Sequence, residues 1–209
     1  MNTESGYLLL VEDDPDILKL LDTTLTFSGY RVVTARNGNE GLEVIHKERP
    51  AIVITDIMMP KLDGFGLVHR LRLNPETRDI PVVFITATYV APEDREFAFT
   101  AGATHFIQKP LNLEEFLNTI SELLKQGLPV EIEPLDEFDF YDGYRRRLET
   151  KLAQLNKQIT RDELLLGDQT DTGSLALKAS FHKSLSERDD ILLLLDQICE
   201  QLKKYTKPE

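Results

Sequence analysis

Short apolar runs rich in β-branched residues alternate with longer amphipathic segments over residues 6–126. The apolar residues within each run are continuous, a pattern typical of parallel strands that helices cover on both faces. Five of these runs are predicted strands: 7–11, 30–34, 51–55, 82–86 and 104–107. Their alternation with amphipathic segments predicts an α/β domain, over 1–126, with a doubly wound five-stranded parallel sheet.

Residues that start helices occupy the segments between these strands. Asp14 and Pro15 combine a capping side chain with a proline suited to the first helical turn. The pairs Ser28-Gly29 and Ala101-Gly102 lie where one secondary-structure element should end and the next should begin. We therefore expect five helices, beginning near Pro15, Asn39, Gly64, Pro92 and Asn112.

The composition changes after this region. Residues 127–138 contain prolines and several acids without helical periodicity, which predicts a linker. Residues 139–209 show apolar residues at intervals of three and four, which predicts two helices joined by a turn at 167–173, an all-α helical hairpin or coiled coil. The first helical seam contains Tyr141, Leu148, Leu152, Leu155 and Ile159, and the second contains Ile191, Leu195, Ile198, Leu202 and Tyr205.

The sequence allows two starting positions for the second helix. Ser184 and Glu187 form a plausible capping box, whereas residues 174–181 are also compatible with a helix that begins earlier. Further leucines widen the apolar stripe of each helix: Leu164, Leu165, Leu192 and Leu194. Because a two-helix hairpin buries little core, we expect 139–209 to form a homodimeric four-helix bundle or to pack on the first domain, and so to serve dimerisation or partner docking, unless these leucines only pack internally.

Charge and composition exclude several classes of protein. The chain has 24 Lys and Arg against 36 Asp and Glu, a net charge of −12, which makes nucleic-acid binding unlikely on electrostatic grounds. The single cysteine cannot close an internal disulfide, and no signal peptide or membrane-spanning run is visible, so we expect a cytoplasmic protein without membrane association. No GxGxxG or Walker-type loop indicates a nucleotide site.

Polar side chains follow four of the predicted strands. Glu12 and Asp13 follow the first, Asp56 the third, Thr86 the fourth and Lys109 the fifth. Because the carboxyl ends of parallel strands form the ligand-binding edge of an open sheet, these side chains should meet there. Clustered carboxylates with few other ligands suit Mg²⁺, and a cation beside a lysine can stabilise a transferred phosphoryl group. Asp56, at the end of the central strand, is then the predicted nucleophile.

Four motifs carry a family resemblance: LLLVEDDP at 8–15, IVITDIMMPKLDGFGL at 52–67, VVFITA at 82–87 and FIQKP at 106–110. With these motifs in this order, the chain resembles the response-regulator receiver domain of two-component signalling, which has a CheY-like, flavodoxin-like fold. The resemblance implies that a sensor histidine kinase or a phosphotransfer protein is the phosphoryl donor. It also implies a protein that hydrolyses its own acyl phosphate but turns over no external substrate, and so is not an enzyme.

The resemblance also assigns roles to individual residues. Asp56 is the implied phosphoacceptor. Mg²⁺ is implied to bind Asp13, Asp56 and the backbone carbonyl of Met58 directly and Glu12 through water. Thr86 and Lys109 would bind the phosphoryl group, and the bond between Lys109 and Pro110 would be cis. Phe106 would be the aromatic switch that moves with Thr86, whereas Asp14 is not expected to be a ligand.

Two alternatives remain for the output of residues 139–209. A phosphorelay role would use His182 on the helical tail as a second phosphoacceptor, although its neighbours lack a recognisable pattern. A transcriptional regulator with an atypical DNA-binding output is the other, but the tail carries more acids than bases and no helix-turn-helix. We therefore favour an output by dimerisation or protein contact.

Overall fold

The computed structural model describes residues 6–87, 91–126, 133–167 and 174–205. The chain divides into two compact units, one ending at Leu135 and the other beginning at Asp136. The division falls inside the predicted linker at 127–138. None of the helices in the described ranges is long and apolar enough to cross a membrane.

A five-stranded parallel sheet forms the centre of the first unit, with the strand order β2-β1-β3-β4-β5. Its strands are β1 (Leu8–Val11), β2 (Val32–Ala35), β3 (Ile52–Asp56), β4 (Val82–Thr86) and β5 (His105–Gln108). The predicted fold class is therefore confirmed, with strand ends that differ from the sequence prediction by one or two residues. The difference is largest at β2, because the N–H of Tyr30 donates to the carbonyl of Leu25 and so belongs to the turn that ends the preceding helix.

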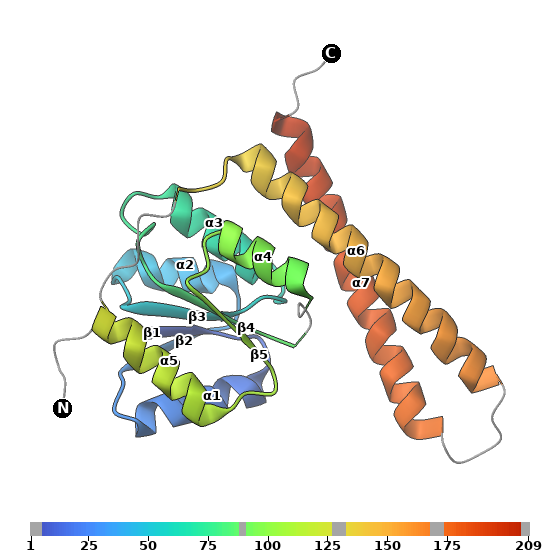
Figure 1. Cartoon of the computed structure of the whole chain (residues 1–209), viewed down its shortest axis with the longest axis horizontal. Helices are drawn as coiled ribbons and strands as arrows, with labels where there is room; N and C mark the ends of the chain where they lie inside the picture. Colours follow the sequence, from blue (N-terminus) through green and yellow to red (C-terminus); the bar gives the residue numbers. More distant parts are fainter. Residues whose placement is uncertain (1–5, 88–90, 127–132, 168–173, 206–209) are drawn as a thin grey trace. The chain divides into compact units, whose positions relative to one another are not determined.

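Five helices cover the two faces of this sheet (Figure 1). They are α1 (Pro15–Phe27), α2 (Gly38–Lys47), α3 (Gly64–Leu73), α4 (Pro92–Thr100) and α5 (Leu113–Gln126). Helices α1 and α5 lie on one face, and α2, α3 and α4 lie on the other (Figure 1). Side chains cap several helices. Asp14 accepts the N–H groups of Asp16 and Ile17, as the sequence predicts, and Asp63 accepts that of Gly66, which was not predicted.

Apolar side chains from alternate strand positions make the core beneath α1 and α5. Leu10, Ile54 and Ile85 on the strands pack with Leu21 of α1 and Phe116 of α5. This burial on both faces explains why the strands are continuously apolar in sequence. A sheet held from both sides fixes its carboxyl edge, where the polar strand ends gather.

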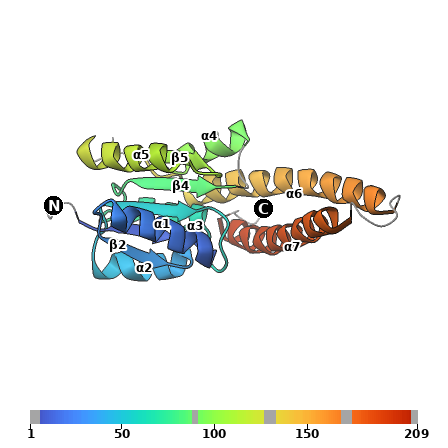
Figure 2. The ribbon, with the colours of Figure 1, turned by 90° about the horizontal axis from the view of Figure 1, so that it is seen from below.

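The second unit contains two long helices, α6 (Glu137–Gly167) and α7 (Ser174–Tyr205), which lie side by side (Figures 1 and 2). Nζ of Lys151 on α6 lies 3.8 Å from Oε1 of Glu187 on α7. Both helices agree with the sequence prediction, and Leu148, Leu155, Ile159, Ile191 and Ile198 of the predicted seams are buried. The predicted turn at 167–173 falls, after Gly167, outside the described residues.

Helix α7 begins at Ser174, so the earlier of the two predicted starts is correct. The capping box at Ser184 and Glu187 is wrong, because Ser184 lies inside the helix and is buried. The seven-residue spacing of Leu177, Ser184 and Ile191 continues the seam upstream, which explains why the helix does not start at a serine that is chemically suited to a cap.

Candidate functional site

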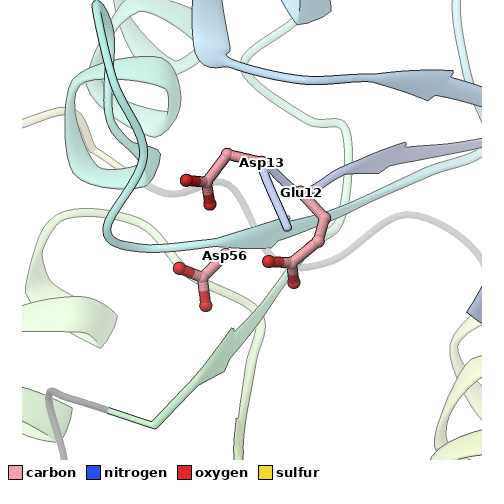
Figure 3. A group of neighbouring side chains, drawn as sticks. All are labelled: Glu12, Asp13 and Asp56. Atoms are coloured by element: carbon pink, nitrogen blue, oxygen red, sulfur yellow. The ribbon is translucent and has the colours of Figure 1, made fainter. Parts of the chain in front are cut away.

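Three carboxylates meet at the carboxyl edge of the sheet. Glu12 and Asp13 follow β1, and Asp56 is the last residue of β3 (Figure 3). One oxygen atom from each lies within 4.8 Å of the others. Glu12 and Asp56 are buried, whereas Asp13 is exposed. The structure therefore brings together the acidic residues that the sequence predicts.

Local hydrogen bonds explain how the first two carboxylates are held. The N–H of Glu12 donates to the carbonyl of Ala35 at 3.1 Å, which ties the end of β1 to β2. Two residues later Asp14 caps α1, so Glu12 and Asp13 occupy the short bend between strand and helix. Asp14 uses its carboxylate for the cap, and the expectation that it is not a ligand stays a prediction.

Lys109 connects two of these carboxylates. Its ammonium donates to Glu12 Oε2 at 2.9 Å and to Asp56 Oδ1 at 3.0 Å. The backbone N–H of Lys109 donates to the carbonyl of Thr86 at 2.8 Å, which fixes the residue beside the end of β4. The peptide bond between Lys109 and Pro110 is cis, as the family resemblance implies.

Burial and charge shift the ionisation of the cluster. Burial, and after it the charge of Asp56, raises the pKa of Glu12 to about 7, although Lys109 opposes the shift. Burial also raises the pKa of Asp56 and of Asp13 above their ordinary value. Burial alone would lower the pKa of Lys109, but the charges of Asp56 and Glu12 outweigh it and raise that pKa. The single positive charge of Lys109 therefore neutralises only part of the negative charge of the three carboxylates.

This donor set fits Mg²⁺. The ion prefers hard oxygen ligands, and it is commonly bound through one or two carboxylates with water completing its shell. The exposed Asp13 leaves one side of the cluster open to water, and a divalent cation would supply the positive charge that Lys109 alone does not. Met58, the fourth predicted ligand, follows Asp56 by two residues, and its N–H donates to Asp56 Oδ2 at 3.0 Å. A role for the Met58 carbonyl stays a prediction.

Thr86 and Phe106 lie on one face of the sheet. In the β4–β5 register Phe84 pairs with Phe106 and Thr86 with Gln108, so Thr86 and Phe106 are diagonal neighbours. Both residues are buried. Their predicted roles, binding the phosphoryl group and switching, stay predictions. His182 is an exposed residue of α7, in the other unit, and its role as a second phosphoacceptor also stays a prediction.

Two residues that support the site were not predicted to do so from the sequence. Gly64, at the start of α3, donates its N–H to Ile57 at 2.8 Å and so brings the helix against the backbone of Asp56. Arg72 is fully buried, and its guanidinium donates to the carbonyls of Gly102, Arg78 and Ile80. Arg72 thereby joins α3 to the segments that precede β4 and β5.

Comparison with known proteins agrees with this geometry. The family described as the response regulator receiver domain matches residues 8–121. A protein of Pyropia yezoensis named as a probable transcriptional regulator, ycf27, is 37% identical over 127 residues, which cover 61% of this chain and 51% of that protein. The ycf27 protein of Cyanidium caldarium is 30% identical over 193 residues, 91% of this chain and 75% of that protein. The transcriptional regulatory protein GlrR of Escherichia coli is 32% identical over 187 residues, 88% of this chain and 40% of that protein.

Solved structures show the same likeness in the first unit. The chemotaxis protein CheY4 of Vibrio cholerae has a TM-score of 0.54 and 32% identity, and the match covers 57% of this chain and 98% of that one. A CheY-like receiver domain from Methanospirillum hungatei has a TM-score of 0.54 and 31% identity, over 59% of this chain and 96% of that one. The chain spans about half the length of the first curated relatives it matches. From its strand-end carboxylates, its sheet order and these matches, the chain belongs to the response regulator receiver domain family.

Proposed function

We propose that Asp56 is a Mg²⁺-dependent phosphoacceptor and that a sensor histidine kinase or a phosphotransfer protein supplies the phosphoryl group. The observation that carries this proposal is the contact of Lys109 with both Asp56 and Glu12 at the carboxyl edge of the sheet. A buried carboxylate paired with an ammonium and flanked by two further carboxylates has the charges that phosphoryl transfer needs.

In the transfer, a carboxylate oxygen of Asp56 attacks the phosphorus, and the bond from phosphorus to the donor's imidazole nitrogen breaks. The nitrogen keeps the electron pair, and Asp56 becomes an acyl phosphate. Lys109 neutralises an oxygen of the transferred group, and the hydroxyl of Thr86 donates to another. Glu12, Asp13, Asp56 and the Met58 carbonyl would hold Mg²⁺, which supplies further positive charge for the phosphoryl oxygens. Water later hydrolyses the acyl phosphate, with no external substrate turned over.

Phosphorylation of the full chain by acetyl phosphate, a small phosphodonor, tests this assignment. Intact mass spectrometry should show Mg²⁺-dependent phosphate on the wild type and none on Asp56→Asn. Asp22→Asn, which removes a carboxylate in the middle of α1, is the matched control and should be phosphorylated normally. Unchanged phosphate incorporation in Asp56→Asn would reject Asp56 as the acceptor.

We further propose that residues 139–209 form a homodimer whose assembly carries the output. Support comes from leucines that remain exposed on the hairpin although half of its seam residues are buried: Leu164, Leu165, Leu175, Leu192 and Leu193. Apolar side chains repeated on the outer surface of two paired helices are what a second hairpin would cover in a four-helix bundle.

Light scattering on the full chain, with and without Mg²⁺ and beryllofluoride, tests this part. Leu193 is 62% exposed on α7 and Leu20 is 54% exposed on α1, so Leu193→Glu and Leu20→Glu form a matched pair. The first should dissociate the dimer and the second should leave it intact. A wild type that is monomeric under both conditions would contradict the proposed dimer.

The names of the relatives favour a second candidate output, transcriptional regulation through DNA. Those matches to ycf27 of Pyropia yezoensis and to GlrR cover only about half or less of each relative, so the names do not by themselves assign an output to residues 139–209. Binding of the full chain to duplex DNA, measured at several salt concentrations, decides between the two. Affinity that falls steeply with salt would favour the DNA output, and the absence of binding would favour protein contact.

A further inference from the structure

Arg95 of α4 lies over two aromatic rings. Its guanidinium carbon is 5.6 Å from the centre of the Phe99 ring and 6.0 Å from that of Phe106. Phe99 follows Arg95 by one helical turn on α4, whereas Phe106 belongs to β5. Phe106 is only 7% exposed, so the arginine lies above a ring that is turned into the protein. A guanidinium in this position attracts the electron-rich face of each ring.

We propose that Arg95 is a positioning residue that holds the Phe106 ring in its buried position and thereby favours the state in which Asp56 carries a phosphoryl group. The inference rests on the proposed function of Asp56 and Thr86 and on the switch role that the family resemblance implies for Phe106, and it adds a regulatory contact from α4 to that site. Arg95 touches neither the carboxylates nor the phosphoryl group, so it acts through Phe106.

The link from Phe106 to the site passes through Thr86. The two side chains are buried diagonal neighbours on one face of the sheet, so they share one closely packed volume. The family resemblance implies that Phe106 moves with Thr86, so that a buried Phe106 ring fills the space that the Thr86 hydroxyl leaves when it reaches toward a phosphoryl group on Asp56. A contact that stabilises the buried ring therefore stabilises the phosphorylated state.

The arrangement of charges supports the same placement of Arg95. Its charge contributes, after burial, to lowering the pKa of His105, the residue before Phe106, while Glu122 of α5 opposes the shift. The guanidinium of Arg95 thus acts on two consecutive residues of β5: it lies over the ring face of Phe106, and its charge lowers the pKa of His105. Loss of Arg95 should therefore raise the pKa of His105, and this change should be measurable in the unphosphorylated protein.

The affinity of the full chain for beryllofluoride with Mg²⁺, followed by the ¹⁹F NMR signal of the bound group, tests the proposal. Because Arg95 is exposed, Arg95→Met should weaken binding about two- to five-fold. Arg95→Lys keeps a cation and should recover part of the loss. Arg70→Met removes an exposed arginine of α3 and should leave the affinity unchanged.

A double-mutant cycle separates the ring contact from a general effect of charge. In a Phe106→Leu background, Arg95→Met should no longer change the affinity, while the NMR titration of His105 should still move to higher pH. An equal loss of affinity in both backgrounds, or no loss in the wild-type background, would overturn the role of Arg95. Absence of beryllofluoride binding to the wild type would instead overturn the proposed function on which the inference rests.

Discussion

Gly64 provides a sharp test of how the backbone positions Asp56. A Cβ atom at Gly64 would overlap the carbonyl oxygen of Asp56 and would lie 2.9 Å from the Cα of Ile57 and 3.1 Å from a ring carbon of Phe84. Two of these three neighbours are backbone atoms, which cannot rotate away as a flexible side chain can. Gly64→Ala therefore has to push the start of α3 away from the end of β3.

The size of the effect follows from this geometry. Overpacking a closely packed site costs about 1–3 kcal/mol, and contacts with backbone atoms place Gly64→Ala near the upper end of that range. The displacement also moves the reacting carboxylate of Asp56. A misplacement of about 1 Å lowers a reaction rate on the order of 100-fold, so phosphorylation should slow more than the loss of stability alone explains.

Gly41→Ala is the matched control for this substitution. A Cβ there would meet side-chain atoms only, at 3.4 Å from Val11 and 3.6 Å from Leu67, inside the helix α2. Alanine is favoured over glycine in a helix by about 1 kcal/mol, so this variant should be at least as stable as the wild type. Hydrogen exchange of the β3 amides in urea reports the stability of the receiver, and mass spectrometry with acetyl phosphate reports the rate. If the two variants behave alike in both assays, the close approach of Gly64 to Asp56 does not constrain the site.

Three further predictions concern single side chains. Arg72→Met removes the donor from the carbonyl of Arg78 and from the buried carbonyls of Gly102 and Ile80, and should destabilise the receiver by about 3–5 kcal/mol, measured by the same exchange experiment. His105 has a lowered pKa in the folded state, so around its ordinary pKa of 6.5 the unfolded chain binds more protons than the folded one. The free energy of unfolding should therefore fall as the pH drops through 6.5. In urea titrations at pH 7.5 and 5.5, His105→Gln should lose this part of the pH dependence. Asp162→Leu replaces a buried carboxylate whose Oδ2 accepts no hydrogen bond from the described residues, and it should raise the thermal midpoint of the hairpin.

The fold of the first unit was predictable because each signal in the sequence is local. Continuous apolar runs and a helix cap such as Asp14 specify strands and helix starts without knowledge of their neighbours. The error at β2 arises at the end of the preceding helix, because the N–H of Tyr30 donates to the carbonyl of Leu25, five residues earlier, and so delays the start of the strand. The candidate site was predictable for the same reason as the fold, because strand ends of a parallel sheet share one edge.

The supporting contacts of the site were not predictable from the sequence. Lys109 could be placed near Asp56 from the order of the strands, but its second contact, with Glu12, depends on side-chain geometry. Arg72 and Arg95 both look like ordinary charged residues of amphipathic helices. Arg72 is buried and donates to three carbonyls, and Arg95 covers two rings, because each side chain meets backbone or ring partners that the sequence pattern does not mark.

The seam of the hairpin combines apolar and polar residues in a way that bears on its output. Asp162 and Ser184 are buried on the two helices, and Lys151 meets Glu187 between them, so several seam positions contribute little apolar area. Polar residues in a helical seam cost stability and can fix register. A hairpin with such a seam gains further stability when its outer leucines are covered. Its two helices should therefore be most stable when a second hairpin is bound, which makes assembly a property that phosphorylation of the receiver could control.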